Sequence, residues 1–367
     1  MSVAARMSLI AVLLAAGAGT ALPAAAAAPA PATRARVERI STDSDGGQLP
    51  SASQAGAVSA DGRYAVFLSR DPGGGEDRIL RLKDLRTGAL TRIPESLVYT
   101  QVTGLSADGR RIAYSDGNRY PMPYVHDRAT GRTTQLWPAR PPEDGSYELG
   151  QTAAISADGR RVAYTLGNRH GLEFASVLYV RDLASGADEQ IVRLSPDAMV
   201  VGASLDAKGR SVAYGVSAST GDGMVGQVYV EDRVTGVTRR VDTGVSARLV
   251  QLSADGRRVL FTVRSEDGTS ASYVRDLRTD RVRRIAGATA LAADGALRFV
   301  VLTEGDTLVL RDLRTGRQRA VAPAEGDAVL PGSVSRHGDA VFTSSAAGLV
   351  QGDTNGVPDV FVARPHR

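Results

Sequence analysis

The sequence contains no cysteine among its 367 residues. A disulfide scaffold, a thiolate nucleophile, a cysteine-ligated zinc or iron–sulfur site and a lipid-modified cysteine are therefore excluded. Histidine is nearly as scarce, because only four are present, at His126, His170, His337 and His366. They leave little material for a metal centre built from clustered histidines.

Lysine is almost absent as well. Only Lys83 and Lys208 are lysines among the 44 basic residues, and the net charge is +4. The arginines are spread along the chain rather than gathered in one basic tract, so we expect no nucleic-acid partner. Apolar residues make up 43% and charged residues 23%, which is the balance of a soluble globular protein.

The N-terminus holds the single long apolar run. Residues 1–28 contain an arginine, the apolar run Leu9–Ala18 and the small-residue stretch Ala21–Ala28, which is the order of a secretory signal peptide. The run has about ten residues, against the roughly 20 that cross a bilayer. We expect cleavage at the end of this segment, a linker over 29–35 and no membrane span in the mature chain. The predicted location is secreted, in the extracellular or cell-envelope space.

The rest of the chain is one unit repeated seven times. A Ser-Ala-Asp-Gly tetrad, or a variant of it, returns roughly every 45 residues. Each tetrad precedes a short apolar segment, and a second signal, Asp-x-x-Thr-Gly, follows later in most repeats. The tetrads are Ser59–Gly62, Ser106–Gly109, Ser156–Gly159, Asp206–Gly209, Ser253–Gly256, Ala292–Gly295 and Ser335–Gly338.

Each repeat predicts four short strands. Asp followed by Gly suits a tight turn, because glycine accepts a positive φ and aspartate caps the turn. The flanking segments alternate with period two, are rich in Val, Ile and Tyr, and show no helical periodicity. Four strands in a repeat of this length predict a β-propeller blade. We expect an all-β, seven-bladed β-propeller of four-stranded blades over residues 36–364, with a tail at 365–367. Six and eight blades are the alternatives.

The two ends of the chain predict how the ring closes. The seventh repeat has no segment left for a fourth strand after Asp359–Ala363, whereas Arg36–Thr42 lies ahead of the first repeat and has a strand pattern. We predict that this N-terminal strand completes the last blade, which removes the open edges of the sheet.

The repeats Ser-Ala-Asp-Gly-Arg-x-Val-Ala-Tyr and Tyr-Val-x-Asp-x-x-Thr-Gly resemble the TolB-like, WD-repeat-like propellers of secreted bacterial proteins. The resemblance covers residues 36–364 and implies the propeller fold. It implies less about function, because such propellers include protein-binding domains and domains attached to peptidases. The Trp-Asp pair of the WD repeat is absent, and Trp137 is the only tryptophan. Repeats six and seven shift their aromatic residue by one position.

Six repeats carry an aspartate shortly before the Thr-Gly turn. A carboxylate at that place can accept backbone N–H groups of the turn. We therefore interpret these aspartates as architecture rather than as a catalytic ring. They are Asp84, Asp127, Asp182, Asp232, Asp276 and Asp312.

The best metal candidate lies in the segment 352–360. Asp353, Asn355 and Asp359 have the spacing of oxygen ligands around a tight Asn-Gly turn, as in calcium loops. Gln351 stands at the first ligand position, so further oxygens would have to come from carbonyls or water. The alternative is a hairpin in which Asp359 opens a strand. We predict no required cofactor, with calcium at these three residues as the alternative.

Propeller topology predicts two different faces. The tight turns belong to one, which we call the turn face. The longer, acidic loops belong to the other, the long-loop face. Aromatic residues among polar loops often form recognition surfaces. The alternative is that they pack on blade edges. The candidate ligand-binding residues on the long-loop face are Tyr99, Tyr120, Trp137, Tyr147, Glu148 and Phe174.

The sequence contains no recognisable set of nucleophile and base. We predict a secreted, non-enzymatic, monomeric propeller that binds an unknown protein or cell-envelope ligand through its long-loop face. The alternative is a secreted hydrolase or lyase acting on glycans or peptides. Such an enzyme would use loop carboxylates such as Glu148, Glu173 and Asp222 as acid and base.

Overall fold

The computed structural model describes residues 33–365 except 71–77, 94–100, 118–120, 139–148, 171–172, 196, 221–222, 243–245, 286 and 325–328. The predicted signal peptide and residues 29–32 of the predicted linker lie outside the described residues. In the part that is described, no helix is long and apolar enough to cross a membrane.

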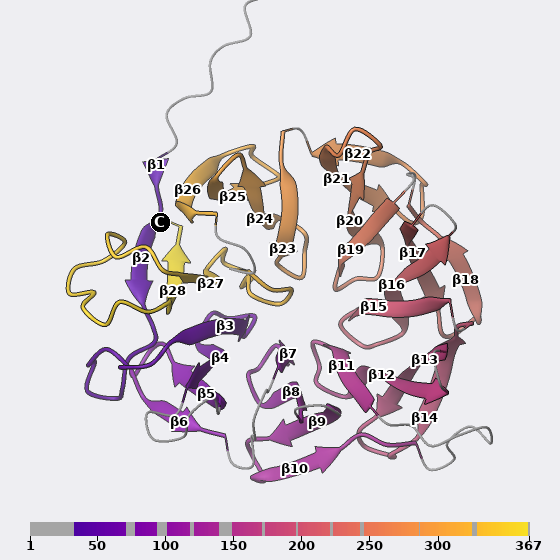
Figure 1. Cartoon of the computed structure of the whole chain (residues 1–367), viewed down its shortest axis with the longest axis horizontal. Helices are drawn as coiled ribbons and strands as arrows, with labels where there is room; N and C mark the ends of the chain where they lie inside the picture. Colours follow the sequence, from indigo (N-terminus) through magenta and orange to yellow (C-terminus); the bar gives the residue numbers. More distant parts are fainter. Residues whose placement is uncertain are drawn as a thin grey trace, which may run out of the picture. The chain divides into compact units, whose positions relative to one another are not determined.

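Seven antiparallel sheets surround a common axis, which confirms the predicted seven-bladed β-propeller (Figure 1). The first strand of a blade lies nearest the axis and the chain then runs outward. Blade 1 consists of β3 (Ser53–Val58), β4 (Tyr64–Arg70), β5 (Arg78–Asp84) and β6 (Leu90–Arg92). Blade 2 consists of β7 (Gln101–Leu105), β8 (Arg111–Asp116), β9 (Met122–Asp127) and β10 (Arg132–Gln135). Blade 3 consists of β11 (Leu149–Ile155), β12 (Arg161–His170), β13 (Glu173–Asp182) and β14 (Asp188–Arg193). Blade 4 consists of β15 (Ala198–Leu205), β16 (Ser211–Thr220), β17 (Gly223–Asp232) and β18 (Val237–Arg240). Blade 5 consists of β19 (Ser246–Leu252), β20 (Arg258–Arg264), β21 (Ser270–Asp276) and β22 (Val282–Ile285). Blade 6 consists of β23 (Thr289–Ala293), β24 (Phe299–Glu304), β25 (Thr307–Asp312) and β26 (Gln318–Pro323).

Blade 7 joins the two ends of the chain. It contains β27 (Ala340–Ser344), β28 (Asp359–Arg364) and, on the outside, β2 (Arg36–Arg39). Strand β2 pairs antiparallel with β28, from Arg36 opposite Arg364 to Arg39 opposite Phe361. The predicted closure by the N-terminal strand is confirmed.

The innermost segment of blade 7 differs from the predicted strand. It forms only an isolated bridge between Val334 and Ala340. Pro331 precedes this bridge and has no N–H to donate to a ladder. The turn that follows is also one residue shorter, since Ser335 N–H donates to Asp339 whereas Ser59 N–H donates to Tyr64.

The predicted linker, 29–35, is shorter than expected. Thr33–Arg34 form β1, which pairs in parallel with β26 and adds a fifth strand to the sheet of blade 6. The N–H of Ala35 donates to the carbonyl of Ala320 at 2.9 Å, and Ala35 is buried. The small residues that suggest a flexible linker here allow close packing at the edge of a blade.

A serine organises the turn between the first and second strands. Ser59 Oγ donates to Asp61 Oδ1 at 2.6 Å and accepts from the Tyr64 N–H at 2.9 Å. The same two bonds recur at Ser106, Ser156 and Ser253. The glycine that ends each of these tetrads has positive φ. At Gly109, where φ is 72°, a Cβ would also lie 2.5 Å from Tyr64 Cδ2.

In the sixth repeat the turn lies two residues later than predicted. It spans Asp294–Leu297 instead of Ala292–Gly295, because Asp294 N–H donates to Phe299 and Leu297 N–H donates to Asp294, both at 2.9 Å. Leu297 occupies the glycine position with φ 51°. Its side chain is 2% exposed. Burial of a leucine is worth about 1.5–3 kcal/mol, which offsets the left-handed conformation at about 1–2 kcal/mol.

The turns hydrogen-bond to one another around the axis. The N–H of Ala60 donates to the carbonyl of Ala107 in the next blade, and the N–H of Ala107 donates to Ala157. Further links run from Asp158 to Ala207, from Ala207 to Ala254, from Ala254 to Gly295 and, across the closure, from Arg336 to Ala60. These six bonds measure 2.7–3.0 Å, and we call them the turn circuit. Among the described residues, the junction between blades 6 and 7 has no such bond.

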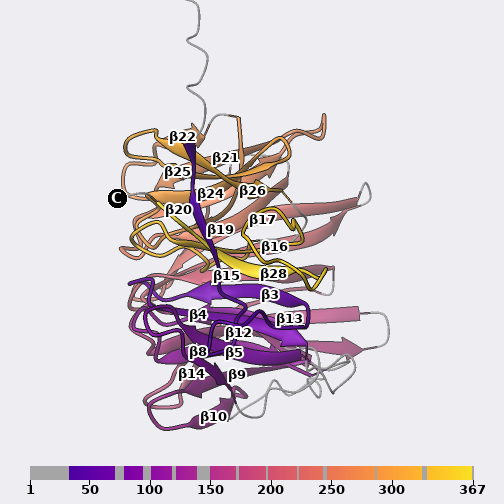
Figure 2. The same ribbon diagram turned by 90° about the vertical axis from the view of Figure 1, so that its left-hand side faces the viewer.

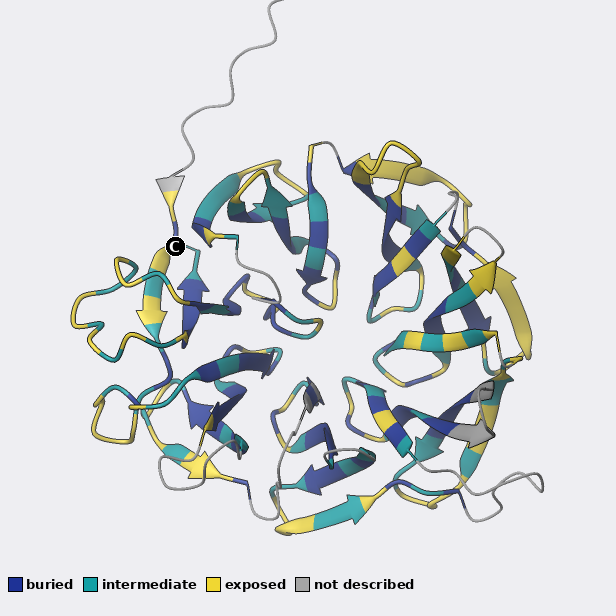
Figure 3. Cartoon of the chain, in the orientation of Figure 1, coloured by how far each residue is buried: buried dark blue, intermediate teal, exposed yellow. Residues whose placement is uncertain are grey.

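The core is divided among the gaps between blades. Each of its seven clusters combines residues of two neighbouring blades, as Phe67 of blade 1 and Val362 of blade 7 do. Burial is deepest on the middle strands, and the outermost strands are exposed (Figure 3). No blade buries both its faces alone, so the fold depends on the closed ring.

Ring closure predicts the effect of two truncations. A chain that begins at Asp43 lacks β1 and β2 and exposes the edge of β28, so we expect a broad thermal transition at lower temperature. A chain that begins at Arg36 lacks only β1 and should keep a sharp transition close to that of the chain beginning at residue 29. Circular dichroism melts of the three chains make the comparison. Equal melts for the two truncated chains would contradict the role of β2.

Candidate functional site

The aspartates that end the third strands are architectural, as predicted. Asp84 Oδ1 accepts from the N–H groups of Arg86 at 2.9 Å and Thr87 at 3.3 Å. Carboxylate bonds to the same turn recur at Asp127, Asp182, Asp232, Asp276 and Asp312. Four of these aspartates also pair with an arginine at, or just before, the start of the second strand of their own blade: Arg63–Asp84, Arg110–Asp127, Arg161–Asp182 and Arg298–Asp312.

Two of these pairs lower a carboxyl pKa strongly. The Arg110 guanidinium, which donates to both oxygens of Asp127 at 2.8 Å, holds the pKa of Asp127 at about 2. Arg298 has the same effect on Asp312, whose pKa is also about 2. Both carboxylates are therefore charged throughout the range in which general acids work, so neither suits that role.

Arginine side chains also connect neighbouring blades. Arg111 Nη1 donates to the carbonyl of Gly159 at 2.6 Å, and Arg161 Nη1 donates to that of Lys208 at 2.7 Å. A guanidinium offers five donors on a long stem, so it can cross from one blade to a backbone carbonyl of the next. Further bonds of this kind join Arg181 to Trp137, Arg239 to Leu277, Arg258 to Ala296 and Arg275 to Val241.

The predicted calcium ligands do converge, and Arg39 lies between them. Asp359 is fully buried and lies 3.0 Å from Arg39 Nε, while Asp353 lies 3.4 Å from Arg39 Nη2. Gln48 Nε2 donates to both carboxylates, at 3.0 Å to Asp353 and 2.7 Å to Asp359. Asn355 Nδ2 donates to the carbonyl of Leu49 at 2.9 Å. The cation of this cluster is a guanidinium supplied by β2.

These contacts do not fit a calcium site. Both carboxylates already face a positive charge, and the amide of Asn355 presents its nitrogen, not its oxygen, to the neighbouring segment. Ser41 Oγ donates a hydrogen bond to Asp359 Oδ1 at 2.6 Å. No group of three or more acidic or histidine side chains within the described ranges could hold a metal ion.

Most of the predicted recognition residues cannot be placed. Tyr99, Tyr120, Tyr147 and Glu148 lie outside the described residues, and the side chain of Phe174, in β13, is not described. Trp137 is half-buried and packs against the core between blades 2 and 3. This packing agrees with the alternative reading that the loop aromatics pack on blade edges.

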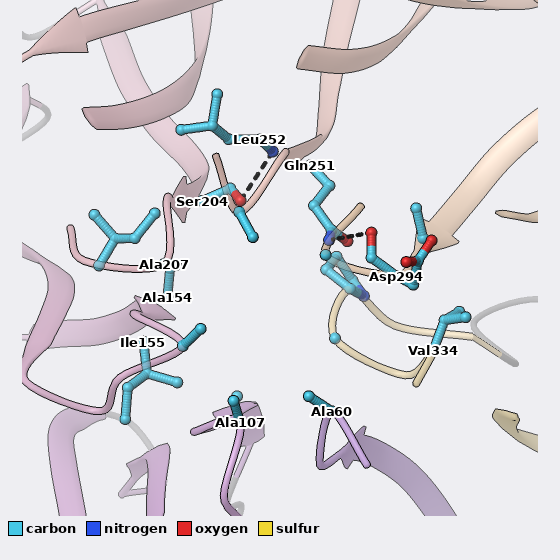
Figure 4. A pocket seen from close by; sticks show the side chains of 18 of the residues that line it. Ala60, Ala107, Ala154, Ile155, Ser204, Ala207, Gln251, Leu252, Asp294 and Val334 are labelled. Carbon is cyan, nitrogen blue, oxygen red and sulfur yellow. Dashed lines mark hydrogen bonds between the residues drawn. The ribbon is translucent and has the colours of Figure 1, made fainter. Parts of the chain in front are cut away.

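A cavity of about 340 Å³ opens around the axis on the turn face (Figure 4). Its wall is made of small and aliphatic residues, such as Ala107, Ala154 and Leu252, from the first strands and the turns that follow them. Four of its lining residues are polar: Ser204, Gln251, Asp294 and Arg336. The sequence analysis missed this site, although Arg336 stands where the other tetrads have alanine or glycine.

Blade 4 carries most of the large hydrophobic residues that are exposed in the described part of the chain. Five of the six large hydrophobic residues that are exposed among those described belong to it: Met199, Val201, Met224, Val234 and Val237. Strands β12, β13, β16 and β17 have ten residues each, against six or seven in the matching strands of blades 1, 2, 5 and 6. These two hairpins project on the long-loop face (Figure 2).

Met199 and Met224 share one side of the projecting hairpin. Met199 lies opposite Ser217, and Met224 lies opposite Ser219 on the same strand, β16. Residues two apart on a strand point to the same side, so both methionines do so too. Val201 lies at the register shift between Val200 and Gly202, and its Cγ2 would lie 3.2 Å from a Cβ on Gly215, two residues before Ser217. We call Met199, Val201 and Met224 the blade 4 patch; their exposed fractions are 38%, 52% and 58%.

No protein-family model and no curated protein matches the chain. An oligogalacturonate lyase in complex with manganese is similar in structure, with a TM-score of 0.62 at 16% identity over 90% of this chain and 93% of the lyase. TolB from Acinetobacter baumannii matches with a TM-score of 0.50 at 19% identity, over 73% of this chain and 65% of TolB. An acylaminoacyl peptidase from Pyrococcus horikoshii matches with a TM-score of 0.56 at 14% identity, over 81% of this chain and 50% of the peptidase.

These similarities define the class of fold. The chain is a seven-bladed β-propeller whose fold is similar to that of TolB, in agreement with the resemblance that the repeat motifs carry. It spans less than two thirds of the TolB structure and half of the peptidase. Propellers of this class have mixed functions, and at such low identity the likeness is one of fold alone.

The prediction that the protein is not an enzyme is contradicted. It depended on the absence of a recognisable nucleophile and base, yet the similar structures include peptidases and an oligogalacturonate lyase that is covered over 93% of its own length. A propeller alone can therefore be an enzyme. Of the carboxylates named for catalysis, Glu148 and Asp222 lie outside the described residues, and the side chain of Glu173 is not described.

The Arg110–Asp127 ion pair predicts that the stability of the fold depends on pH in the acid range. The pKa of Asp127 is about 2 in the folded chain and near 4 when unfolded, so its contribution is complete above pH 4 and is lost as pH falls towards 2. We expect Asp127→Asn to melt below the unsubstituted chain at pH 7 and the two melting temperatures to converge by pH 2. Asp232→Asn, which keeps the turn bonds and removes no arginine pair, is the control. A constant difference from pH 7 to pH 2 would contradict the assignment.

The position of Arg39 predicts a large effect of its removal. The Arg39 side chain is 9% exposed, and Arg39→Ala leaves Asp353 and Asp359 as uncompensated buried charges. We expect a loss of about 3–5 kcal/mol in the free energy of unfolding, measured by denaturant titration. Arg36→Ala, an exposed arginine on the same strand, should change stability by less than about 0.5 kcal/mol. Equal effects of the two substitutions would contradict the prediction that the ion pairs of Arg39 with Asp353 and Asp359 stabilise the fold.

Calcium provides an independent test at the same cluster. Because Arg39 supplies the positive charge, we expect the melting temperature to be the same in EDTA and in excess calcium. A rise with calcium that Asp353→Ala abolishes would instead establish the metal site.

Proposed function

We propose that the protein is an exported β-propeller that binds a protein or cell-envelope ligand through its long-loop face, at the blade 4 patch. The patch is the observation that carries this proposal. Soluble proteins rarely leave several large apolar side chains exposed side by side, and such groups mark sites of association. The projecting hairpins of blades 3 and 4 place it where a partner can reach it.

The chemistry of the patch favours a protein partner. Methionine is flexible and polarisable, so it adapts to the surface of another protein, and it is enriched at interfaces. The half-buried Ser217 and the exposed Ser219 and Thr220 border it with groups that can hydrogen-bond to a partner. An apolar centre with a polar border is the usual composition of a protein interface.

Export is part of the same proposal. Its support is the order of charged, apolar and small residues over 1–28. Expression of the full chain in a bacterial host, followed by N-terminal sequencing of protein from the medium and the envelope fraction, tests it. Protein that starts near residue 29 outside the cytoplasm supports export, whereas uncleaved protein in the cytoplasm contradicts it.

A triple variant tests the blade 4 patch. We expect Met199→Ser, Val201→Ser and Met224→Ser together to weaken binding of the partner at least tenfold, because each buried apolar side chain contributes about 1.5–3 kcal/mol. The partner is first isolated from the envelope fraction of the producing cells with the unsubstituted chain and then purified. Affinities are measured with both purified proteins.

The control variant lies at the other end of the same blade. Val234→Ser and Val237→Ser remove exposed valines of the turn face, with exposed fractions of 76% and 60%, and should leave the affinity unchanged. A partner whose affinity falls equally for both variants, or for neither, contradicts the proposed surface.

Catalysis on an acidic glycan is the second candidate. The match to the lyase over nine tenths of both chains favours it. The assay is incubation with oligogalacturonate, with and without manganese, followed by ultraviolet absorbance of unsaturated product ends. Product formation supports this candidate. Its absence under both conditions leaves it without support.

A further inference from the structure

The outermost strands of blades 4 and 5 carry charge of one sign. Strand β18 has the sequence Val-Thr-Arg-Arg and β22 has Val-Arg-Arg-Ile, and every residue of the two strands except Ile285 is exposed (Figure 3). Arg281 directly precedes β22 and is exposed as well. Charged side chains on an edge strand keep it from pairing with another sheet. Acids would serve that purpose equally well, so protection of the edge does not explain why all these charges are positive.

The two strands border the same seam between blades. Arg239 of β18 donates through Nη2 to the carbonyl of Leu277, so this side of β18 faces blade 5. Arg275 of blade 5 donates to the carbonyl of Val241 in blade 4 at 2.9 Å, and Val282 lies opposite Arg275. Paired residues on neighbouring strands, and residues two apart on one strand, point to the same side. The side chains that line the outer end of this seam are therefore those of Val237, Arg239, Val282 and Arg284.

Each acid on these strands, or in the turns beside them, already has a partner. Asp242 and Asp280 form ion pairs with Arg240 and Arg275, both at 2.7 Å. The other acids accept hydrogen bonds from the Thr238 hydroxyl or from N–H groups of their own turn, and they are Glu231, Asp232 and Asp276.

Four arginines therefore have no acidic partner among the described residues. The side chains of Arg239 and Arg283 contact only a backbone carbonyl of the next blade, which leaves their charge in place. The side chains of Arg281 and Arg284 have no hydrogen bond or ion pair within the described part of the chain. We call these four arginines, together with the exposed Val237 and Val282, the rim strip.

We propose that the rim strip binds an acidic polysaccharide. The strip spans two neighbouring blades, so a ligand that meets all four arginines must be extended and must repeat its charge. The guanidinium fork matches a carboxylate group, and the two exposed valines offer apolar contact to the C–H faces of sugar rings.

The residues between the arginines disfavour a nucleic acid. Single-stranded nucleic acids are held by aromatic side chains on which the bases stack. The rim strip contains no aromatic residue. Tyr273, which lies opposite Arg284, is half-buried against the core between blades 4 and 5.

The rim strip is separate from the sites proposed above. It lies on the outer edge of the ring, whereas the blade 4 patch lies on the long-loop face, so the triple variant of the patch should bind a polysaccharide as the unsubstituted chain does. Binding at the strip breaks no bond, so it can succeed where the lyase assay fails. Failure of either earlier proposal leaves this one intact.

Fluorescence anisotropy with defined probes tests the ligand class. The probes are a labelled alginate oligosaccharide, whose sugars carry carboxylates, a neutral dextran of equal length, and a short DNA duplex. We expect alginate to bind, with an affinity that falls as salt is added, and the other two to bind at least tenfold more weakly. No binding of alginate, or equal binding of dextran or DNA, would overturn the proposal.

Two triple variants with the same change in net charge locate the site. Arg281→Gln, Arg283→Gln and Arg284→Gln together should weaken alginate binding at least tenfold and flatten its dependence on salt, because three exposed ionic contacts are lost. The control replaces three exposed arginines of blades 1 to 3, whose side chains have no partner among the described residues: Arg86→Gln, Arg132→Gln and Arg160→Gln. It should bind as the unsubstituted chain does. Equal losses in the two variants, or no loss in the first, would overturn the proposal.

Discussion

The turn circuit is the constraint on which the rest of the structure depends. Its six backbone bonds connect neighbouring blades close to the axis, where the blades approach one another most closely. Small side chains suit such an approach, in agreement with the alanine at the second position of most of the repeated tetrads, although Arg336 takes this place in blade 7. The close approach also makes the axial cavity narrow and apolar. Serine or aspartate at the first position holds each turn in the shape that the circuit requires, so the repeat motif encodes contact between blades as well as the turn itself.

Outside the turn circuit, arginine side chains connect neighbouring blades. Guanidinium groups such as those of Arg111 and Arg161 reach carbonyls of the next blade. Lysine has the reach but not the planar set of donors, which gives the arginine excess a structural use. Where the ring closes, Arg39 of the N-terminal strand β2 pairs with Asp353 and Asp359, two buried aspartates of the last blade. The ends of the chain are therefore held by charge as well as by the β2–β28 ladder.

The sequence was sufficient to predict the blade number, the strand order and the closing strand, because each depends on local turn chemistry repeated along the chain. It was insufficient where a different residue performs the same role. Asp294 replaces the turn serine and Leu297 replaces the glycine, so the sixth turn was placed two residues early. The spacing of Asp353, Asn355 and Asp359 could not reveal that Arg39, more than 300 residues away, lies among them. The blade 4 patch and the cavity groups Gln251 and Arg336 also depend on three-dimensional placement, although Arg336 is visible as the exception in its tetrad.

The turn circuit joins the seven blades at six of their seven junctions, so the blades should unfold as one cooperative unit. Native-state hydrogen exchange measures this directly at the amides of Ala60, Ala107, Ala207 and Ala254, which all donate across a junction between blades. The account predicts that the four exchange only by global unfolding, with the same free energy as core amides. The Gly295 N–H, at the open junction between blades 6 and 7, should exchange much faster. If one of the four exchanged orders of magnitude faster than the core of its own blades, the blades would open separately and the account would be contradicted.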